Sequence, residues 1–242
     1  MLSGLSGLSG LSAVCGSAAF SPTQLSGYVN SPYNIALLRS QGKLWQNTAM
    51  TVAAVADGDP VRRIDCNGTY YDAPSDAARP LLWDEGGGKW SLSFDGVDDG
   101  LSLSTRGIPQ PSTVGVSVIV TGNAAGNNVF VSGTNNLDFR RSSGVCQMAV
   151  NYAVSSAAMS MDAWHRVVGC AAVGGQTSTL RFDGAETTGD LGAFGSAAQT
   201  WIGRDFSSLR LGGRIAGVTI CTGLLSAGDR AALDTYLTAL AP

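Results

Sequence analysis

The sequence predicts an all-β fold, an antiparallel sandwich or barrel, from two observations. Glycine supplies 32 of the 242 residues and charged residues only 14%, while serine, threonine and valine are plentiful, which is typical of short strands joined by tight turns. From residue 89 onward, strand-like apolar segments follow one another at short intervals, with no helical pattern between them. The segments are 89–94, 100–104, 114–122, 128–133, 137–141, 145–154, 163–173, 178–184, 200–204 and 214–225.

The chain opens on a low-complexity arm, residues 1–20, in which leucine recurs every third residue between serine and glycine. In a backbone with three residues per turn these leucines form one apolar stripe, whereas an α-helix would spread them over half its surface. We therefore expect an extended anchor docked on a neighbouring subunit, with a disordered tail as the alternative. The anchoring residues are Leu2, Leu5, Leu8 and Leu11.

Two further zones follow the arm. Residues 21–86 form a proline-containing, irregular lead-in, with one short helix expected near residues 34–39. Residues 87–242 hold the β-domain and end in an amphipathic helix, for which Ser226 is the predicted N-cap and Asp229 takes the capping-box position. Its apolar stripe consists of Ala232, Leu233, Tyr236, Leu237 and Leu240.

Charge and hydropathy exclude several classes of function. A net charge of -3 and a pI near 5.0 leave no basic surface for phosphate, so we do not expect nucleic-acid binding. No apolar stretch reaches the roughly 18 to 20 residues of a membrane span, and the start lacks the pattern of a secretory signal peptide. The cysteines form no C-x-x-C pair and predict buried thiols in a protein made in a reducing cytosol, with a disulfide as the alternative. They are Cys15, Cys66, Cys146, Cys170 and Cys221.

The segment FDGVDDG places Asp95, Asp98 and Asp99 around Gly96 at a strand end. Clustered carboxylates can hold a calcium ion, because this hard cation takes six to eight oxygen ligands. In the alternative interpretation the segment is a charged turn whose aspartates accept hydrogen bonds from local backbone amides. Calcium is the one metal that the sequence predicts, and both interpretations stay open.

Enzymatic activity is not expected from the residue inventory. The only glutamates, Glu85 and Glu186, are about a hundred residues apart, so the carboxylate pair of a glycosidase on one strand is missing. His165 is the single histidine and has no evident nucleophile beside it in the sequence, so we expect a surface or strand-edge residue. A tight hairpin turn is predicted at Asp183-Gly184.

A sugar ligand would need exposed aromatic rings and polar side chains. Trp90, Trp164 and Trp201 lie within strand patterns and are expected in the core. Candidate ligand-binding residues outside the expected core are Tyr70, Tyr71, Phe206, Asn135 and Asn136.

Four segments, read in order, resemble the laminin-G / concanavalin A-like lectin superfamily. They are KWSLSFDGVDDGLSLS, DAWHRVVGCAAV, STLRFDGAETT and the stretch from TWIGRDF to DTYL, within residues 83–240. The resemblance implies a two-sheet jelly roll and a carbohydrate or protein ligand at the sheet face or rim, in some members with calcium.

The lead-in is similar to segments that precede such domains in tailed-phage and prophage proteins, through Trp45, the GDPV step at 58–61 and the ARP step at 78–80. This resemblance implies a non-enzymatic virion component, a decoration or spike/fibre protein, made in the host cytoplasm. Expected partners are other capsid or tail proteins and further copies of the chain, with a trimer by analogy to the family. The alternative is a lectin-like module that attaches to a host surface glycan.

Overall fold

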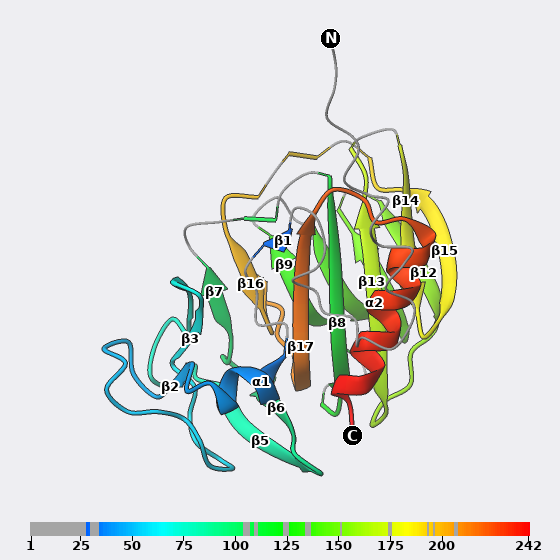
Figure 1. Ribbon diagram of the computed structural model, residues 1–242. Coiled ribbons are helices and arrows are strands. Elements are labelled where there is room, and N and C mark those ends of the chain that lie inside the picture. The colour runs from blue at the N-terminus through cyan, green and yellow to red at the C-terminus, as the bar shows by residue number, and fades with distance from the viewer. Residues whose placement is uncertain are drawn as a thin grey trace.

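The predicted antiparallel two-sheet sandwich is confirmed by a computed structural model (Figure 1). The structure describes residues 28–29, 34–103, 107–108, 111–122, 126–133, 137–150, 152–173, 176–192, 194–195, 197–205 and 208–242. The anchoring leucines Leu2, Leu5, Leu8 and Leu11, and Cys15, lie outside these residues.

One sheet, called sheet A here, has eight strands among the described residues, all joined by antiparallel pairing. Its strands in spatial order are β15 (Ala185–Asp190), β14 (Thr177–Phe182), β13 (Trp164–Ala171), β8 (Ser112–Val120), β17 (Gly212–Thr222), β6 (Lys89–Asp95) and β5 (Leu81–Gly86), with β1 (Tyr28–Val29) paired to β17.

The second sheet, called sheet B here, has nine strands in the same described part of the chain. Their order is β12 (Ala153–Ala158), β11 (Val145–Ala149), β10 (Asp138–Ser142), β9 (Asn128–Gly133), β16 (Thr200–Ile202), β7 (Leu101–Leu103), β4 (Thr69–Asp72), β3 (Arg63–Cys66) and β2 (Leu44–Trp45).

The described part of the lead-in adds strands to both sheets. β5 forms a hairpin with β6 at the edge of sheet A, and β2, β3 and β4 extend sheet B beyond β7. The short helix expected near residues 34–39 is α1 (Ile35–Ser40), whose N-cap Asn34 accepts a hydrogen bond from the Leu37 amide at 2.9 Å. Ile35 and Leu38 of this helix are buried in the core between the sheets.

Alternating apolar side chains of the two sheets form this core, which includes Phe130, Phe139, Val116 and Leu92. At one point the sheets meet without room for a side chain on β13. A Cβ atom at Gly169 would lie 2.1 Å from Phe139 Cε1 and 2.9 Å from Met148 Sδ. Glycine there lets the large phenyl ring fill the space, because interiors pack as densely as organic crystals.

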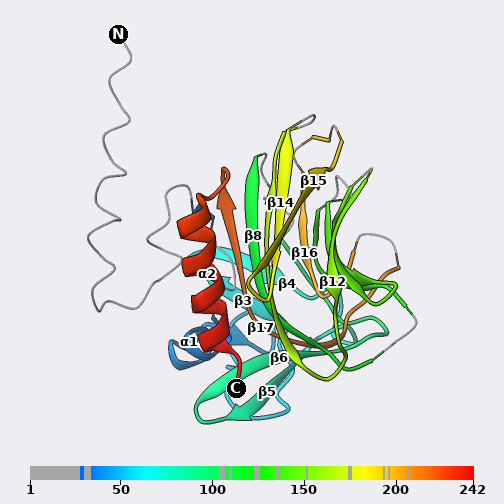
Figure 2. The ribbon, with the colours of Figure 1, turned by 90° about the vertical axis from the view of Figure 1, so that its right-hand side faces the viewer.

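The predicted C-terminal helix is α2 (Ala227–Leu240), and it covers the outer face of sheet A over β13, β8 and β17 (Figure 2). Ser226 caps it, because its hydroxyl accepts a hydrogen bond from the Asp229 amide at 3.2 Å and donates one to the Asp229 carboxylate at 2.7 Å. Leu233 and Leu237 pack against Gly115 of β8. No helix in the described residues is long and apolar enough to cross a membrane.

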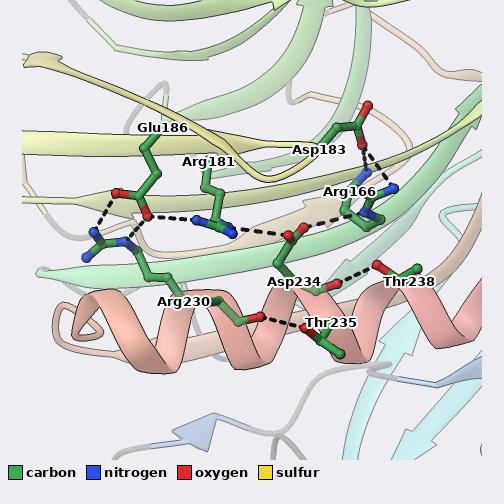
Figure 3. Close-up of polar contacts among 9 residues, drawn as sticks. Arg166, Arg181, Asp183, Glu186, Arg230, Asp234, Thr235 and Thr238 are labelled. Atoms are coloured by element: carbon green, nitrogen blue, oxygen red, sulfur yellow. Dashed lines mark hydrogen bonds and ion pairs between the residues drawn. The ribbon is translucent and has the colours of Figure 1, made fainter.

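An ion-pair chain fixes α2 to the sheet (Figure 3). Asp234, 7% exposed, lies between Arg166 of β13 at 3.5 Å and Arg181 of β14 at 3.3 Å. Arg181 also pairs with Glu186 of β15, which pairs with Arg230 of α2 at 2.8 Å. The bond to Arg230 holds the pKa of Glu186 below its ordinary value. The face of α2 that packs on the sheet thus contains a buried carboxylate, Asp234, in addition to its apolar stripe.

Four of the cysteines, Cys66, Cys146, Cys170 and Cys221, are buried free thiols, as predicted. Burial raises the pKa of Cys66 and Cys221 to about 12 and that of Cys146 further, so these thiols stay protonated and unreactive.

Candidate functional site

A row of side chains crosses the outer face of sheet B. Residues that pair directly on neighbouring antiparallel strands point to the same face, so the register defines this row. Its neighbours along the strands, such as Phe139, Val131 and Ile202, face the core. The row, from β10 to β2, is Asp138, Ser132, Trp201, Ser102, Asp72, Arg63 and Trp45.

Neither helix of the described residues lies on the outer face of sheet B. α2 lies on the opposite side of the sandwich, and α1 contacts β6, β17 and the outlying strand β3 (Figure 2). Neither of the two described helices packs against β9, β16 or β7. In the middle of the row Trp201 is partly exposed, whereas Ser132 beside it is fully buried.

Trp201 and Arg204 form a cation–π pair in the middle of the row. The guanidinium carbon of Arg204 lies 4.8 Å from the centroid of the Trp201 ring, a cation–π distance. Both side chains are partly exposed. The stem of Arg204 lies on Gly100, where a Cβ atom would come within 2.2 Å of Arg204 Cδ. Glycine at position 100 thus leaves room for the arginine stem, whose guanidinium lies over the ring.

Arg204 carries a charge that no ion pair within the described residues neutralises. Its Nε donates to the Asp205 carbonyl at 3.2 Å, and its pKa is lowered by burial and by the neighbouring Arg210. The group nevertheless stays protonated, as arginine does in proteins. Arg204 can therefore donate hydrogen bonds to hydroxyl or carboxylate oxygens of a bound molecule.

Next to this pair, the row contains a buried carboxylate. Asp138 is 8% exposed, and its Oδ1 atom has no hydrogen-bond partner among the described residues, while Oδ2 lies 3.4 Å from Arg140. Burial raises the pKa of Asp138 to about 7, against the opposing effect of Arg140. Ser132, between Asp138 and Trp201, donates its hydroxyl to the Arg204 carbonyl at 2.9 Å. An orphaned acceptor beside an aromatic ring is typical of a site that a polar ligand completes.

A second aromatic side chain lies at the far end of the row. Tyr70 is 36% exposed, and the Arg63 guanidinium carbon lies 4.4 Å from its ring centroid. Arg63 is held by two bonds to Asp72 at 2.7 and 2.8 Å, and the bond to Asp72 raises the pKa of the guanidinium. The expectation for Tyr71 was wrong. It is fully buried opposite Ile64 in the core, because consecutive residues of β4 point to opposite faces.

The predicted metal residues come together at the turn between β6 and β7. One oxygen each of Asp95, Asp98 and Asp99 lies within 4.8 Å of the others. Asp95 Oδ1 also accepts the Val97 amide at 2.8 Å, and Asp99 Oδ2 accepts the Asp95 amide at 2.9 Å. The charged-turn hydrogen bonds and the carboxylate cluster therefore exist in the same segment.

The acidic turn matches calcium in the type of donor atom that it offers. The donors are hard carboxylate oxygens, and Asp99, 6% exposed, has its pKa raised to about 7 by burial and by the fields of Asp95 and Asp98. A bound cation would offset the burial and the mutual repulsion of these carboxylates. Three carboxylates, however, supply only part of the six to eight oxygens that calcium requires. This acidic turn lies next to the row on sheet B. Arg204 packs against Gly100, and the negative charge of Asp98 acts on the Arg204 guanidinium.

The remaining predicted ligand residues, Phe206, Asn135 and Asn136, lie outside the described residues. The three tryptophans that were expected in the core lie in different places. Trp90 is 9% exposed in the core, as expected, while Trp164 lies beside α2 and Trp201 lies on the outer face. The signal for Trp201 was present in the sequence, because Ile202 beside it is the apolar, core-facing residue of a three-residue strand.

The location of His165 differs from the expectation. It is 6% exposed on β13, which lies inside sheet A between β8 and β14. Its ring stacks on Phe182, with centroids 5.0 Å apart, and Nδ1 lies 2.6 Å from Asp183 Oδ2. The predicted turn at Asp183-Gly184 is confirmed, with φ of 45° and 90°.

Comparison with known proteins supports the fold alone. No family model and no curated protein matches the chain. Trypanosoma rangeli sialidase in complex with sialic acid matches 94% of this chain and 35% of its own, with TM-score 0.55 and 11% identity. The same enzyme in a second structure matches 94% and 34%, with TM-score 0.51 and 12% identity. Domain 4 of AbnA, an extracellular arabinanase from Geobacillus stearothermophilus, in complex with arabinotriose, matches 64% and 81%, with TM-score 0.46 and 15% identity. The chain spans about a third of the sialidase chains, and its likeness to them identifies a β-sandwich.

Proposed function

We propose that this chain binds a carbohydrate on the outer face of sheet B, at Trp201 and Arg204. The observation that carries the proposal is the indole–guanidinium cation–π pair on a sheet face that neither of the described helices covers. Sugars bind proteins by stacking their apolar faces on aromatic rings while planar polar groups bond their hydroxyls. Asp138 lies on the same face, beyond the buried Ser132, and its carboxylate supplies a polar group near the ring.

The charge of Arg204 favours an acidic sugar. Among the described residues no carboxylate pairs with it, whereas Arg63 at the other end of the row is paired with Asp72. A guanidinium that already has its counter-ion gains little from a second carboxylate, while a free one gains a charge-assisted hydrogen bond. A uronic or sialic acid residue would place its carboxylate at Arg204 and its ring on Trp201.

The display role in a tailed-phage or related particle stays a prediction from the sequence, and we propose it as the context of this binding. Its anchoring segment, residues 1–20, lies outside the described residues. Deleting residues 1–20 should prevent incorporation into particles and leave the sandwich folded. Normal occupancy in purified particles after the deletion would remove the anchor from the account.

A glycan array tests the binding proposal. The full chain is expected to retain acidic glycans, and Trp201→Ala should lose them. Trp83→Ala is the matched control, because Trp83 is an exposed tryptophan on sheet A with Arg214 at 5.1 Å from its ring. Binding that survives Trp201→Ala, or that is absent from a broad array, would refute the proposal.

A further inference from the structure

The single histidine of the chain lies between a serine and an aspartate. Ser160 Oγ is 3.1 Å from His165 Nε2, and His165 Nδ1 is 2.6 Å from Asp183 Oδ2. Ser160 is exposed, His165 is buried, and Asp183 is part-buried. The three residues come from the β12–β13 loop, from β13 and from the β14–β15 turn, so the arrangement cannot be read from the sequence.

We propose that Ser160, His165 and Asp183 form a nucleophilic site that hydrolyses short carboxylic esters. A serine hydroxyl bonded to an imidazole, which is in turn oriented by a carboxylate, is the arrangement that activates serine on unrelated folds. The inference concerns sheet A and does not depend on carbohydrate binding at sheet B. It revises the expectation, drawn from the sequence, that the chain is not an enzyme.

Each member is held in place by the surrounding backbone. The loop with Ser160 is fixed on both sides, because the Met159 amide donates to the Gly144 carbonyl at 2.8 Å and the Asp162 amide to the Val120 carbonyl at 2.9 Å. A site whose groups are already positioned before the reaction loses less entropy in reaching the transition state.

Asp183 is fixed as firmly. Its amide donates to the Arg166 carbonyl at 3.0 Å, and its Oδ1 accepts the Arg166 amide at 2.9 Å. The bond from His165 and the bond from the Arg166 amide hold the pKa of Asp183 below its ordinary value, in opposition to its burial. The carboxylate therefore stays ionised and can favour the imidazole tautomer with its proton on Nδ1. In that tautomer Nε2 is free to accept the Ser160 proton.

The reaction balances without a cofactor. Ser160 Oγ attacks the ester carbonyl carbon, its proton passes to His165 Nε2, and the carbonyl π electrons move to oxygen. When the tetrahedral species collapses, the C–O bond to the alcohol breaks, and the alcohol takes the proton from Nε2. Water then repeats the steps on acyl-Ser160, giving a carboxylic acid and the free serine.

The surroundings of His165 can also stabilise the imidazolium that forms during the reaction. The Ser160 carbonyl oxygen lies 3.2 Å from Nε2 and can accept its proton in a hydrogen bond while His165 is an imidazolium. Asp183 and the stacked Phe182 ring hold the ring on its other sides. Ala157 and Ala158, at the end of β12 near Ser160, are small and exposed and offer little apolar surface to a long acyl group.

Covalent labelling tests the site on the full chain. A fluorophosphonate probe should modify Ser160, located by peptide mass spectrometry, and p-nitrophenyl acetate should be hydrolysed. Ser160→Ala is expected to abolish labelling and to lower the esterase rate by about 100-fold or more. Ser208→Ala, which removes another exposed serine, should leave both unchanged.

The positioning role of Asp183 needs a separate readout. Asp183→Asn should lower kcat with KM unchanged and slow the labelling of Ser160, because the imidazole loses the partner that orients its tautomer. The outcome that overturns the proposal is a folded chain, with a wild-type melting temperature, whose Ser160 is not labelled or whose esterase rate is the same in Ser160→Ala. Ser160 and His165 would then serve only to join the loop to β13.

Discussion

Replacing Asp138 by asparagine should stabilise the protein above neutral pH. The carboxyl is 8% exposed, and within the part of the chain that the structure describes Oδ1 has no hydrogen-bond partner, while the ion pair to Arg140 is 3.4 Å long. Burial raises its pKa from 3.8 to about 7, so the folded state binds a proton more tightly than the unfolded chain. For a raised carboxyl pKa, this penalty is absent below pH 4, grows as pH rises to about 7, and is constant above.

The magnitude follows from the shift. About 3 pKa units at about 1.36 kcal/mol each set an upper limit of roughly 4 kcal/mol on the gain of Asp138→Asn at pH 8.5. Urea denaturation of both proteins at a series of pH values from 4 to 8.5 measures the difference in free energy of unfolding. Equal stability near pH 4 and a growing advantage of the variant toward pH 7 are expected. A variant that is less stable at pH 8.5, or a difference that ignores pH, would refute the reasoning.

Three further predictions concern other parts of the fold. Asp234→Ala should cost about 1–3 kcal/mol of unfolding free energy, since it removes the shared partner of Arg166 and Arg181, which keep their pairs with Asp183 and Glu186, and urea denaturation measures this. Gly169→Ala should cost about 1–3 kcal/mol by overpacking against Phe139, whereas Gly195→Ala, whose added Cβ would meet no atom of the described residues within 4 Å, should be near neutral in the same assay. If the acidic turn binds calcium, millimolar calcium should raise the melting temperature, and a chelator should reverse the rise. Asp98→Asn should abolish this effect, whereas the control Asp190→Asn should keep it. A melting temperature that does not change with chelator would discard the site.

Elements with a local chemical signature could be predicted from the sequence. The cap at Ser226, the turn at Asp183-Gly184 and the convergence of Asp95, Asp98 and Asp99 depend on neighbouring residues only, and each is present. β15 has no such signature. All but one of its residues, AETTGD, are exposed at the edge of sheet A, so no apolar alternation marks it. The strands of the lead-in were missed because they are short and owe their formation to β6 and β7.

The candidate site depends on contacts between distant segments. Asp138, Ser132 and Trp201 become neighbours only through the order β10, β9, β16, and the loop after β16 brings Arg204 over the ring. The triad of Ser160, His165 and Asp183 depends in the same way on the pairing of β13 with β14. Alternation within a strand can show which face a residue takes, as for Tyr70 and Tyr71, but it cannot show which strands are adjacent.

The central claim is that Trp201 and Arg204 form the carbohydrate site, and the affinity of the full chain for an acidic glycan retained on the array tests it most directly. Isothermal titration should give a dissociation constant that rises at least about 30-fold in Trp201→Ala, equivalent to about 2 kcal/mol, and that is unchanged in Trp83→Ala. Equal affinity of the wild type and Trp201→Ala, with Trp83→Ala also unaffected, would contradict the account.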